Sequence, residues 1–128
     1  MRLLLDTRLL LWALGDPAKL PAAARQGILD SANEVLFSAA SIWEIAIKAE
    51  LGRADFGARP EDIARVAIES GFDELPVRAM HAALTARLPR HHRDPFDRLL
   101  VAQAMTEPAR LLTVDAALGP YSELVVVL

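Results

Sequence analysis

Residues 1–14, MRLLLDTRLLLWAL, contain the alternation on which the fold depends. Three leucines end at Asp6, and a second run of leucines follows from Thr7 to Leu14. A short apolar run predicts a buried strand, and the longer segment that follows it predicts a helix. Asp16 and Pro17 then predict the end of this helix, because proline cannot continue one. The N-terminus is therefore predicted to be a strand followed directly by a helix.

The same alternation continues along the rest of the chain. We expect further helices at 20–34, 41–52, 59–71, 78–88 and 94–105. We expect further strands at 35–39, 109–114 and 124–128, with a weak strand or an extended link at 72–77. Apolar strands that alternate with helices are typical of a parallel sheet covered on both faces. The sequence thus predicts a single α/β domain over 1–128, with three α/β/α layers and a mainly parallel sheet.

The composition excludes several classes of protein. The 128 residues include no cysteine, which excludes disulfides, cysteine-based zinc sites and a cysteine nucleophile. Asp6 and Arg8 interrupt the N-terminal apolar run, which is too short to cross a bilayer, so we expect a cytoplasmic protein with no membrane partner. The net charge of −3 gives no general attraction for nucleic acid, whereas 53% hydrophobic residues predict a surface that contacts another protein.

Four acidic residues lie where a strand ends or a helix begins. Asp6 and Asp115 each follow a predicted strand, and Glu44 and Asp97 each lie early in a predicted helix. Ligands of parallel sheets bind at the carboxyl ends of the strands. We therefore expect these four carboxylates to converge at one edge of the sheet.

Each acid also has a structural interpretation. Asp6 is a good helix cap, and Ser41 with Glu44 has the spacing of a capping box. Asp94, followed by a proline, has the sequence of another cap, and Asp97 then lies in the favoured first turn. Asp115 has the composition of a turn. Capping and clustering remain open alternatives at each of these positions.

A cluster of such acids predicts a divalent metal ion. Glu44 and Asp97 have apolar neighbours in the sequence, and burying several unpaired charges together is costly. Oxygen ligands without cysteine favour Mg²⁺ or Mn²⁺ over zinc. Such an ion suits the hydrolysis of a phosphodiester by an activated water. Hydroxyls of Thr7, Ser41 and Thr113 lie close to the acids in sequence and are further candidates to bind a ligand oxygen.

Four segments together resemble a known family. They are LLLDT (3–7), SAASIWEIAIKAELGR (38–53), RDPFDRLLVAQA (93–104) and LLTVD (111–115). In this order they resemble the PIN domain, and within it the VapC-type toxins of bacterial toxin–antitoxin pairs.

The resemblance implies a function, a metal and partners. It implies an Mg²⁺- or Mn²⁺-dependent endoribonuclease with Asp6, Glu44, Asp97 and Asp115 as catalytic and metal-binding acids. Asp94 is an extra acid that either helps to hold the metal or caps the helix. The implied partners are RNA, a small cognate antitoxin protein and a second copy of the chain in a homodimer.

A basic rim is predicted around the acids, to guide the RNA backbone. Its members are Arg90, His91, His92, Arg93 and Arg98, with Lys48 and Arg53 as further candidates. The alternative is a solvated charged loop without function. Two other functions also remain open: a phosphohydrolase that forms an aspartyl phosphate at Asp6, and a non-catalytic interaction domain. Arg8 stands where the first of these usually has a second aspartate.

Overall fold

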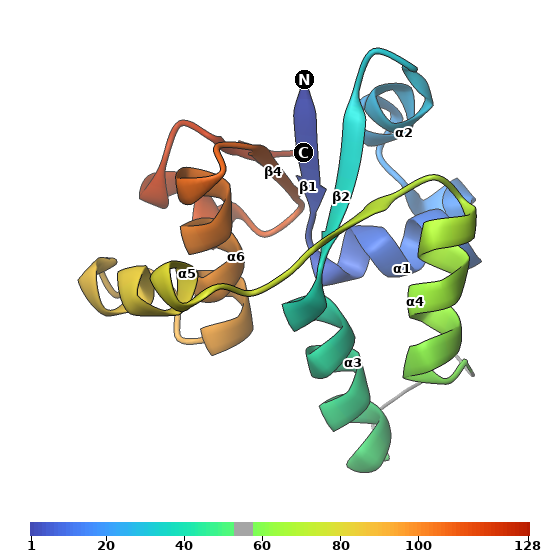
Figure 1. Cartoon of the computed structure of the whole chain (residues 1–128). Helices are drawn as coiled ribbons and strands as arrows, with labels where there is room; N and C mark the ends of the chain where they lie inside the picture. Colours follow the sequence, from blue (N-terminus) through green and yellow to red (C-terminus); the bar gives the residue numbers. More distant parts are fainter. Residues whose placement is uncertain (53–57) are drawn as a thin grey trace.

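The first strand lies at the centre of a five-stranded parallel sheet with the order β3-β2-β1-β4-β5. Figure 1 shows β1 between β2 and β4. The structure is a computed structural model, and it describes residues 1–52 and 58–128. The strands are β1 (Arg2–Leu5), β2 (Glu34–Ser38), β3 (Asp73–Leu75), β4 (Arg110–Thr113) and β5 (Val125–Val127). Register pairs Leu4 with Leu36 on one side and with Leu111 on the other.

Helices cover both faces of this sheet (Figure 1). The helices are α1 (Thr7–Gly15), α2 (Ala22–Leu29), α3 (Ala39–Glu50), α4 (Pro60–Glu69), α5 (Ala79–Leu84) and α6 (Pro95–Thr106). Three short 3₁₀ helices join them: η1 (Pro17–Lys19), η2 (Thr85–Arg87) and η3 (Ala116–Tyr121). The predicted α/β/α architecture with a parallel sheet is confirmed.

Alternation along β1 divides the apolar interior into two cores. Leu3 and Leu5 point to the face covered by α1, α2, α3 and α4, whereas Leu4 points to the face covered by α5, α6 and η3. Successive side chains of a strand point to opposite faces, so a strand that is leucine throughout serves both cores. The central strand is therefore buried on both sides, as its sequence predicts.

Several predicted elements differ from the structure. The helix predicted over 20–34 ends at Leu29, because the Asp30 carboxylate accepts from Ala32 N–H and the Asn33 amide donates to the Gly27 carbonyl. The helix predicted over 78–88 ends at Leu84 and continues as η2. The 3₁₀ helix η3 was not predicted. In the weak segment 72–77, the structure forms the edge strand β3.

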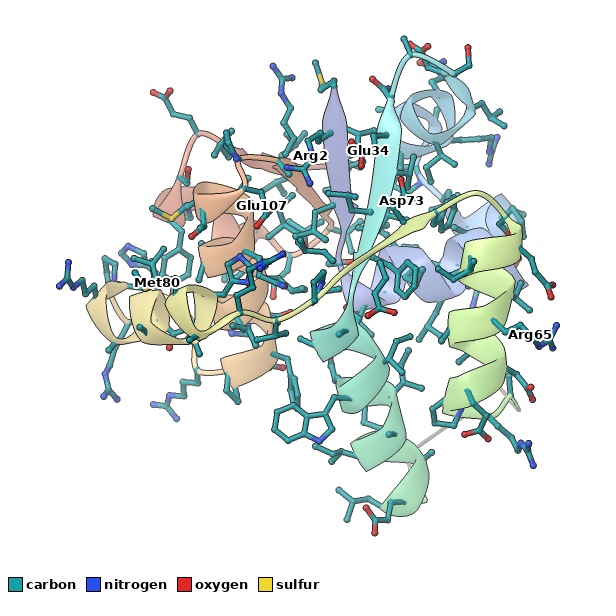
Figure 2. All side chains as sticks on the ribbon, in the orientation of Figure 1. Arg2, Glu34, Arg65, Asp73, Met80 and Glu107 are labelled. Atoms are coloured by element: carbon teal, nitrogen blue, oxygen red, sulfur yellow. The ribbon has the colours of Figure 1, made fainter. Side chains whose placement is uncertain are left out.

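Charged residues gather at the amino end of the sheet, away from the ends of the strands that carry the acids (Figure 2). Arg2 lies 3.4 Å from both Glu34 and Glu107, and the buried His81 lies 2.9 Å from Glu107. This group joins β1 and β2 to the ends of α5 and α6. Within the described residues, no helix is both long and apolar enough to span a membrane.

Candidate functional site

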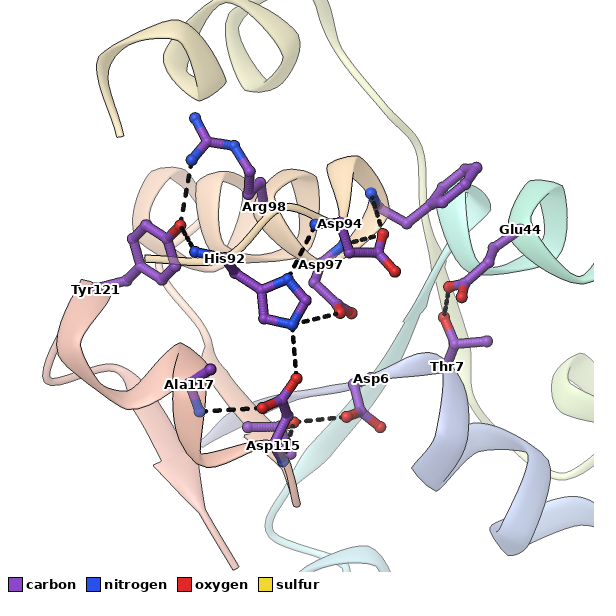
Figure 3. A network of polar contacts seen from close by, with 12 residues as sticks. Asp6, Thr7, Glu44, His92, Asp94, Asp97, Arg98, Asp115, Ala117 and Tyr121 are labelled. Atoms are coloured by element: carbon purple, nitrogen blue, oxygen red, sulfur yellow. Dashed lines mark hydrogen bonds and ion pairs between the residues drawn. The ribbon is translucent and has the colours of Figure 1, made fainter. Parts of the chain in front are cut away.

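The site lies at the carboxyl end of the sheet, where chain direction brings four elements together. Asp6 follows β1 directly, and Asp115 lies two residues beyond β4. The chain runs outward from β1 to β2 on one side and reaches β4 on the other, so the gap between β1 and β4 is a topological switch point. Helices α3 and α6 bring Glu44 and Asp97 to the same place (Figure 3).

All five predicted acids line one pocket of about 590 Å³. They are Asp6, Glu44, Asp94, Asp97 and Asp115. Lys48 and Thr7 line the same pocket, together with two cations that were not predicted as site residues, Arg8 and Lys19. The predicted convergence of the acids is therefore present in the fold.

Asp6 is both a helix cap and a pocket residue. One carboxylate oxygen accepts from Leu9 N–H at 2.8 Å, and the other accepts from the Thr113 hydroxyl at 2.6 Å. Burial raises the pKa of Asp6 above its usual value, and these hydrogen bonds only partly oppose that rise. Thr113 also accepts from the backbone N–H of Asp115 at 3.0 Å, so one hydroxyl links the acids of β1 and β4.

Asp97 has the most strongly perturbed carboxylate of the pocket. Burial, followed by the charges of Asp94 and Glu44, raises its pKa to about 7. His92, whose Nε2 lies 3.6 Å from Asp97, acts in the opposite direction but does not cancel the rise. Desolvation and repulsion among acids both penalise the ionised form, and a nearby cation removes both penalties.

Glu44 is held by two partners and is not part of a capping box. The Thr7 hydroxyl lies 2.7 Å from one carboxylate oxygen, and Lys48 Nζ lies 2.7 Å from the other. A hydroxyl has one proton and a carboxylate only accepts, so Thr7 donates to Glu44 and accepts from Ser41 at 2.9 Å. Ser38, not Ser41, caps α3, so the capping-box alternative is wrong.

Asp94 and Asp115 cap their elements at the rim of the pocket. Asp94 accepts from Phe96 N–H at 2.8 Å and begins α6, with Pro95 in its first position. Asp115 accepts from Ala117 N–H at 3.0 Å and begins η3. Burial acts to raise the pKa of Asp115, but the hydrogen bonds from Ala117 and His92 outweigh it and lower this pKa.

His92 was predicted to belong to the basic rim, but in the structure it lies against the acids. Its Nε2 lies 2.8 Å from Asp115 and 3.6 Å from Asp97 (Figure 3). One ligand atom from each of His92, Asp97 and Asp115 lies within 4.8 Å of the other two. Nothing in the sequence separates this histidine from its exposed neighbour His91, because only the folded loop determines which ring turns inward.

The other predicted rim residues differ in where they lie. Arg90 and Arg93 are exposed, as a substrate-guiding rim requires. Arg98 turns away from the pocket: its guanidinium donates to the carbonyls of Thr85, Leu88 and Pro89 and to the Tyr121 hydroxyl. This arginine therefore binds the preceding loop. Arg53 lies outside the described residues.

The chemistry of the donor set fits a divalent ion such as Mg²⁺ or Mn²⁺. Three carboxylates, Asp6, Asp97 and Asp115, approach the switch point from different elements, and the pKa of two of them is raised. Hard cations prefer such oxygen ligands, and their charge offsets the repulsion that the acids impose on one another.

Solved structures share this fold. The chain superposes with a TM-score of 0.71 on a chain of VapBC2 from Rickettsia felis bound to a DNA fragment from their promoter, at 14% identity over 99% of this chain and 97% of that chain. It superposes with a TM-score of 0.59 on FitAcB from Neisseria gonorrhoeae, at 18% identity over 91% of this chain and 89% of that chain. No curated protein sequence matches the chain.

The solved structures show a shared fold, and a match to a family model shows that the chain also shares a family. The model of the PIN domain matches residues 3–122, which include every acid of the pocket. The sequence resemblance, the parallel sheet and the position of the acids agree with this match. The chain belongs to the PIN domain family.

Proposed function

We propose that this protein is an Mg²⁺- or Mn²⁺-dependent endoribonuclease and the toxin of a type II toxin–antitoxin pair. PIN domains are generally nucleases and typically use divalent metals. The observation that carries the proposal is the convergence of Asp6, Glu44, Asp97 and Asp115 in one pocket at the switch point of the sheet, where burial also raises the pKa of Asp6 and Asp97. A divalent cation offsets the desolvation and repulsion that raise these pKa values, and an acidic pocket needs such a charge before it can accept a phosphate.

The acids divide into ligands and supports in this proposal. Asp6, Asp97 and Asp115 hold the metal, with Glu44 completing the set directly or through water. When bound, the ion orients and activates water for attack on the phosphodiester. Asp94 remains the cap of α6 and adds negative charge beside Asp97.

Hydroxyls and cations of the pocket have separate roles. Thr113 orients Asp6, and Thr7 with Ser41 orients Glu44. Lys48 neutralises part of the charge of Glu44 and, with Arg8 and Lys19, lies where it can meet substrate phosphates. Arg90 and Arg93 guide the RNA backbone from outside the pocket, and Arg53 stays a candidate for the same role.

A cognate antitoxin and a second copy of the chain are the proposed protein partners. The neighbour from Rickettsia felis is a toxin–antitoxin complex. Exposed apolar side chains supply surface for such contacts: Trp43, Leu51 and Met80 are each 60% exposed or more. Trp43 packs edge to face on Phe96, with ring centroids 5.2 Å apart, and both line a shallow groove with Leu99. We propose that the protein acts in the cytoplasm.

RNA cleavage by the purified protein, free of antitoxin, tests the proposed activity. Bulk tRNA and rRNA are incubated with Mn²⁺ or with chelator, beside single-stranded DNA. We expect cleavage of RNA that requires metal, is lost in Asp97→Asn and is kept in Asp73→Asn, which changes an exposed acid of β3.

The same experiment separates the alternatives. Cleavage that survives both chelator and Asp97→Asn contradicts a metal mechanism at this pocket. Release of phosphate from a phosphomonoester, with labelling of Asp6, would support the phosphohydrolase instead. Absence of any hydrolysis, together with absence of Mn²⁺ binding, would support the non-catalytic interaction domain.

A further inference from the structure

The imidazole of His92 is fixed from three directions in the loop that leads into α6. The backbone N–H of His92 donates to the Tyr121 hydroxyl at 2.9 Å. The ring nitrogen Nδ1 accepts from the backbone N–H of Asp94 at 3.0 Å, and Nε2 lies 2.8 Å from an Asp115 carboxylate oxygen (Figure 3). Both ring nitrogens and the backbone are therefore engaged, and the ring has one orientation.

These contacts fix which nitrogen carries the proton. A backbone N–H is always a donor, so Nδ1 must present its lone pair to Asp94. The proton of the neutral ring is then on Nε2, which donates it to Asp115. A nitrogen that carries a proton has no lone pair for a metal, so His92 in this arrangement is a hydrogen-bond donor and not a ligand.

The two acids that His92 faces come from different parts of the chain. Asp97 is in the first turn of α6, whereas Asp115 follows β4. Asp115 is fixed at one oxygen by Ala117 N–H and at the other by His92. His92 Nε2 also lies 3.6 Å from Asp97, so a single N–H group faces both acids.

We propose that His92 is a positioning residue, which holds the Asp115 carboxylate opposite Asp97 at the spacing that a divalent ion requires. This inference rests on the proposed function, because that function supplies the metal. Hydrogen-bond partners of metal ligands fix the orientation of those ligands and typically change metal affinity 10- to 100-fold. Here the partner is an imidazole and the ligand is a carboxylate.

The position of His92 is itself supported from outside the pocket. Tyr121, which accepts the His92 backbone N–H, also accepts from Arg98 at 3.2 Å. His91 stacks edge-on against the Tyr121 ring, with centroids 4.9 Å apart, and is exposed. The two neighbouring histidines thus differ: one ring faces the acids, and the other packs on the outer surface.

Variants of the two histidines test this role through metal binding. His92→Leu fills similar space without a donor, His92→Gln restores an amide N–H, and His91→Ala is the matched control. Calorimetry with Mn²⁺ measures the affinity of each, and urea unfolding confirms that each is folded. We expect His92→Leu to bind Mn²⁺ about 10- to 100-fold more weakly, His92→Gln to recover most of that loss, and His91→Ala to match the parent.

Nitrogen-15 NMR of the unaltered protein tests the same role without any substitution. We expect the His92 ring to carry its proton on Nε2 in the metal-free protein and to keep it when Mg²⁺ is added. A proton on Nδ1, or loss of the Nε2 proton on adding Mg²⁺, would overturn the inference, because His92 would then be free to ligate. Equal Mn²⁺ affinity in His92→Leu and the parent would overturn it as well.

Failure of the proposed function gives a different result. A parent that binds Mn²⁺ in a His92-dependent way but cleaves no RNA supports the positioning role and rejects the nuclease. A parent that binds no Mn²⁺ overturns both.

Discussion

At the scale of single residues, capping and site formation are compatible roles of the same side chain. Asp6, Asp94 and Asp115 each cap a helical element, and each also lines the pocket. A carboxylate has two oxygens with several lone pairs, so one backbone N–H does not exhaust it. A cap at the carboxyl end of a parallel strand is therefore already in the position of a ligand.

Asp97 predicts how the stability of the metal-free protein depends on pH. Burial and the neighbouring acids raise its pKa from an ordinary value of 3.8 to about 7, so between these two pH values the folded state binds the proton more tightly than the unfolded chain does. Stability from this group is present at low pH and is lost as pH rises through about 7. Because the Asp97 side chain is still 20% exposed, solvent screening reduces the full effect of the shift, and we expect Asp97→Asn to exceed the parent in free energy of unfolding by about 2 kcal/mol above pH 7.

Urea unfolding in chelator at pH 5, 6, 7 and 8 measures this difference. The advantage of Asp97→Asn over the parent should grow across the series, and Asp73→Asn should show no such trend. A difference between Asp97→Asn and the parent that stays constant with pH would contradict the raised pKa.

Removal of the Thr7 hydroxyl is expected to destabilise the protein, because it leaves buried polar groups without a partner. Thr7→Val keeps the shape of the side chain but leaves one oxygen of Glu44 and the hydroxyl of Ser41 without this partner. Leaving buried polar groups unpaired costs about 1–3 kcal/mol, and we expect that loss in the free energy of unfolding. Thr7→Ser, which keeps the hydroxyl, is the control. Equal urea midpoints for Thr7→Val and Thr7→Ser would refute the contact.

At the scale of elements, the local sequence predicts a strand or helix correctly where hydrophobic pattern and end signals agree. It fails where side-chain hydrogen bonds to the backbone determine the end of an element. The leucines of β1 and the proline and acids at the start of α4 are sufficient to place those elements. The early end of α2 depends on side chains of Asp30 and Asn33 that bind the backbone, and no periodicity reveals that. The 3₁₀ helix η3 was missed because Asp115 was assigned to a turn.

The candidate site likewise contains residues that could be predicted from the sequence and residues that could not. The acids were predictable because each follows a strand or begins a helix, and parallel strands end at one edge. The inward turn of His92 and the outward turn of Arg98 were not, because both depend on one loop packed against Tyr121. Contacts between residues that are distant in the sequence leave no local sequence pattern.

The hydrogen bonds of Arg98 are expected to stabilise the loop that precedes α6. One guanidinium nitrogen donates to Pro89 O at 2.8 Å, and the other donates to Thr85 O at 2.7 Å. A lysine cannot reproduce this fork of donors. We expect Arg98→Lys to lower the free energy of unfolding by about 1–3 kcal/mol, whereas Arg90→Lys, at an exposed position, leaves it unchanged. Equal unfolding curves for the two variants would contradict this structural role and favour the earlier prediction that Arg98 belongs to the substrate-binding rim.

At the scale of the whole molecule, the sheet separates two apolar cores, and the acidic pocket lies where the central strands end. The pocket is lined by residues that follow β1 and β4 and by residues of α1, α3 and α6, and these helices come from both sides of the sheet. A cation bound there contacts elements that are together only in the folded state. Metal binding is therefore coupled to the stability of the entire domain.

This coupling predicts that Mn²⁺ and Mg²⁺ raise the melting temperature of the parent at pH 7.5. A ligand that binds only the folded state at 100 times its dissociation constant adds about 2.7 kcal/mol, which for a domain of this size is a rise of roughly 10 °C. Asp97→Asn should begin at a higher melting temperature in chelator and gain less from metal, because it loses both the repulsion and a ligand. Thermal unfolding with each metal, with chelator and with NaCl at equal ionic strength measures these shifts. An equal rise in NaCl would show that screening, and not a bound ion, relieves the repulsion among the acids.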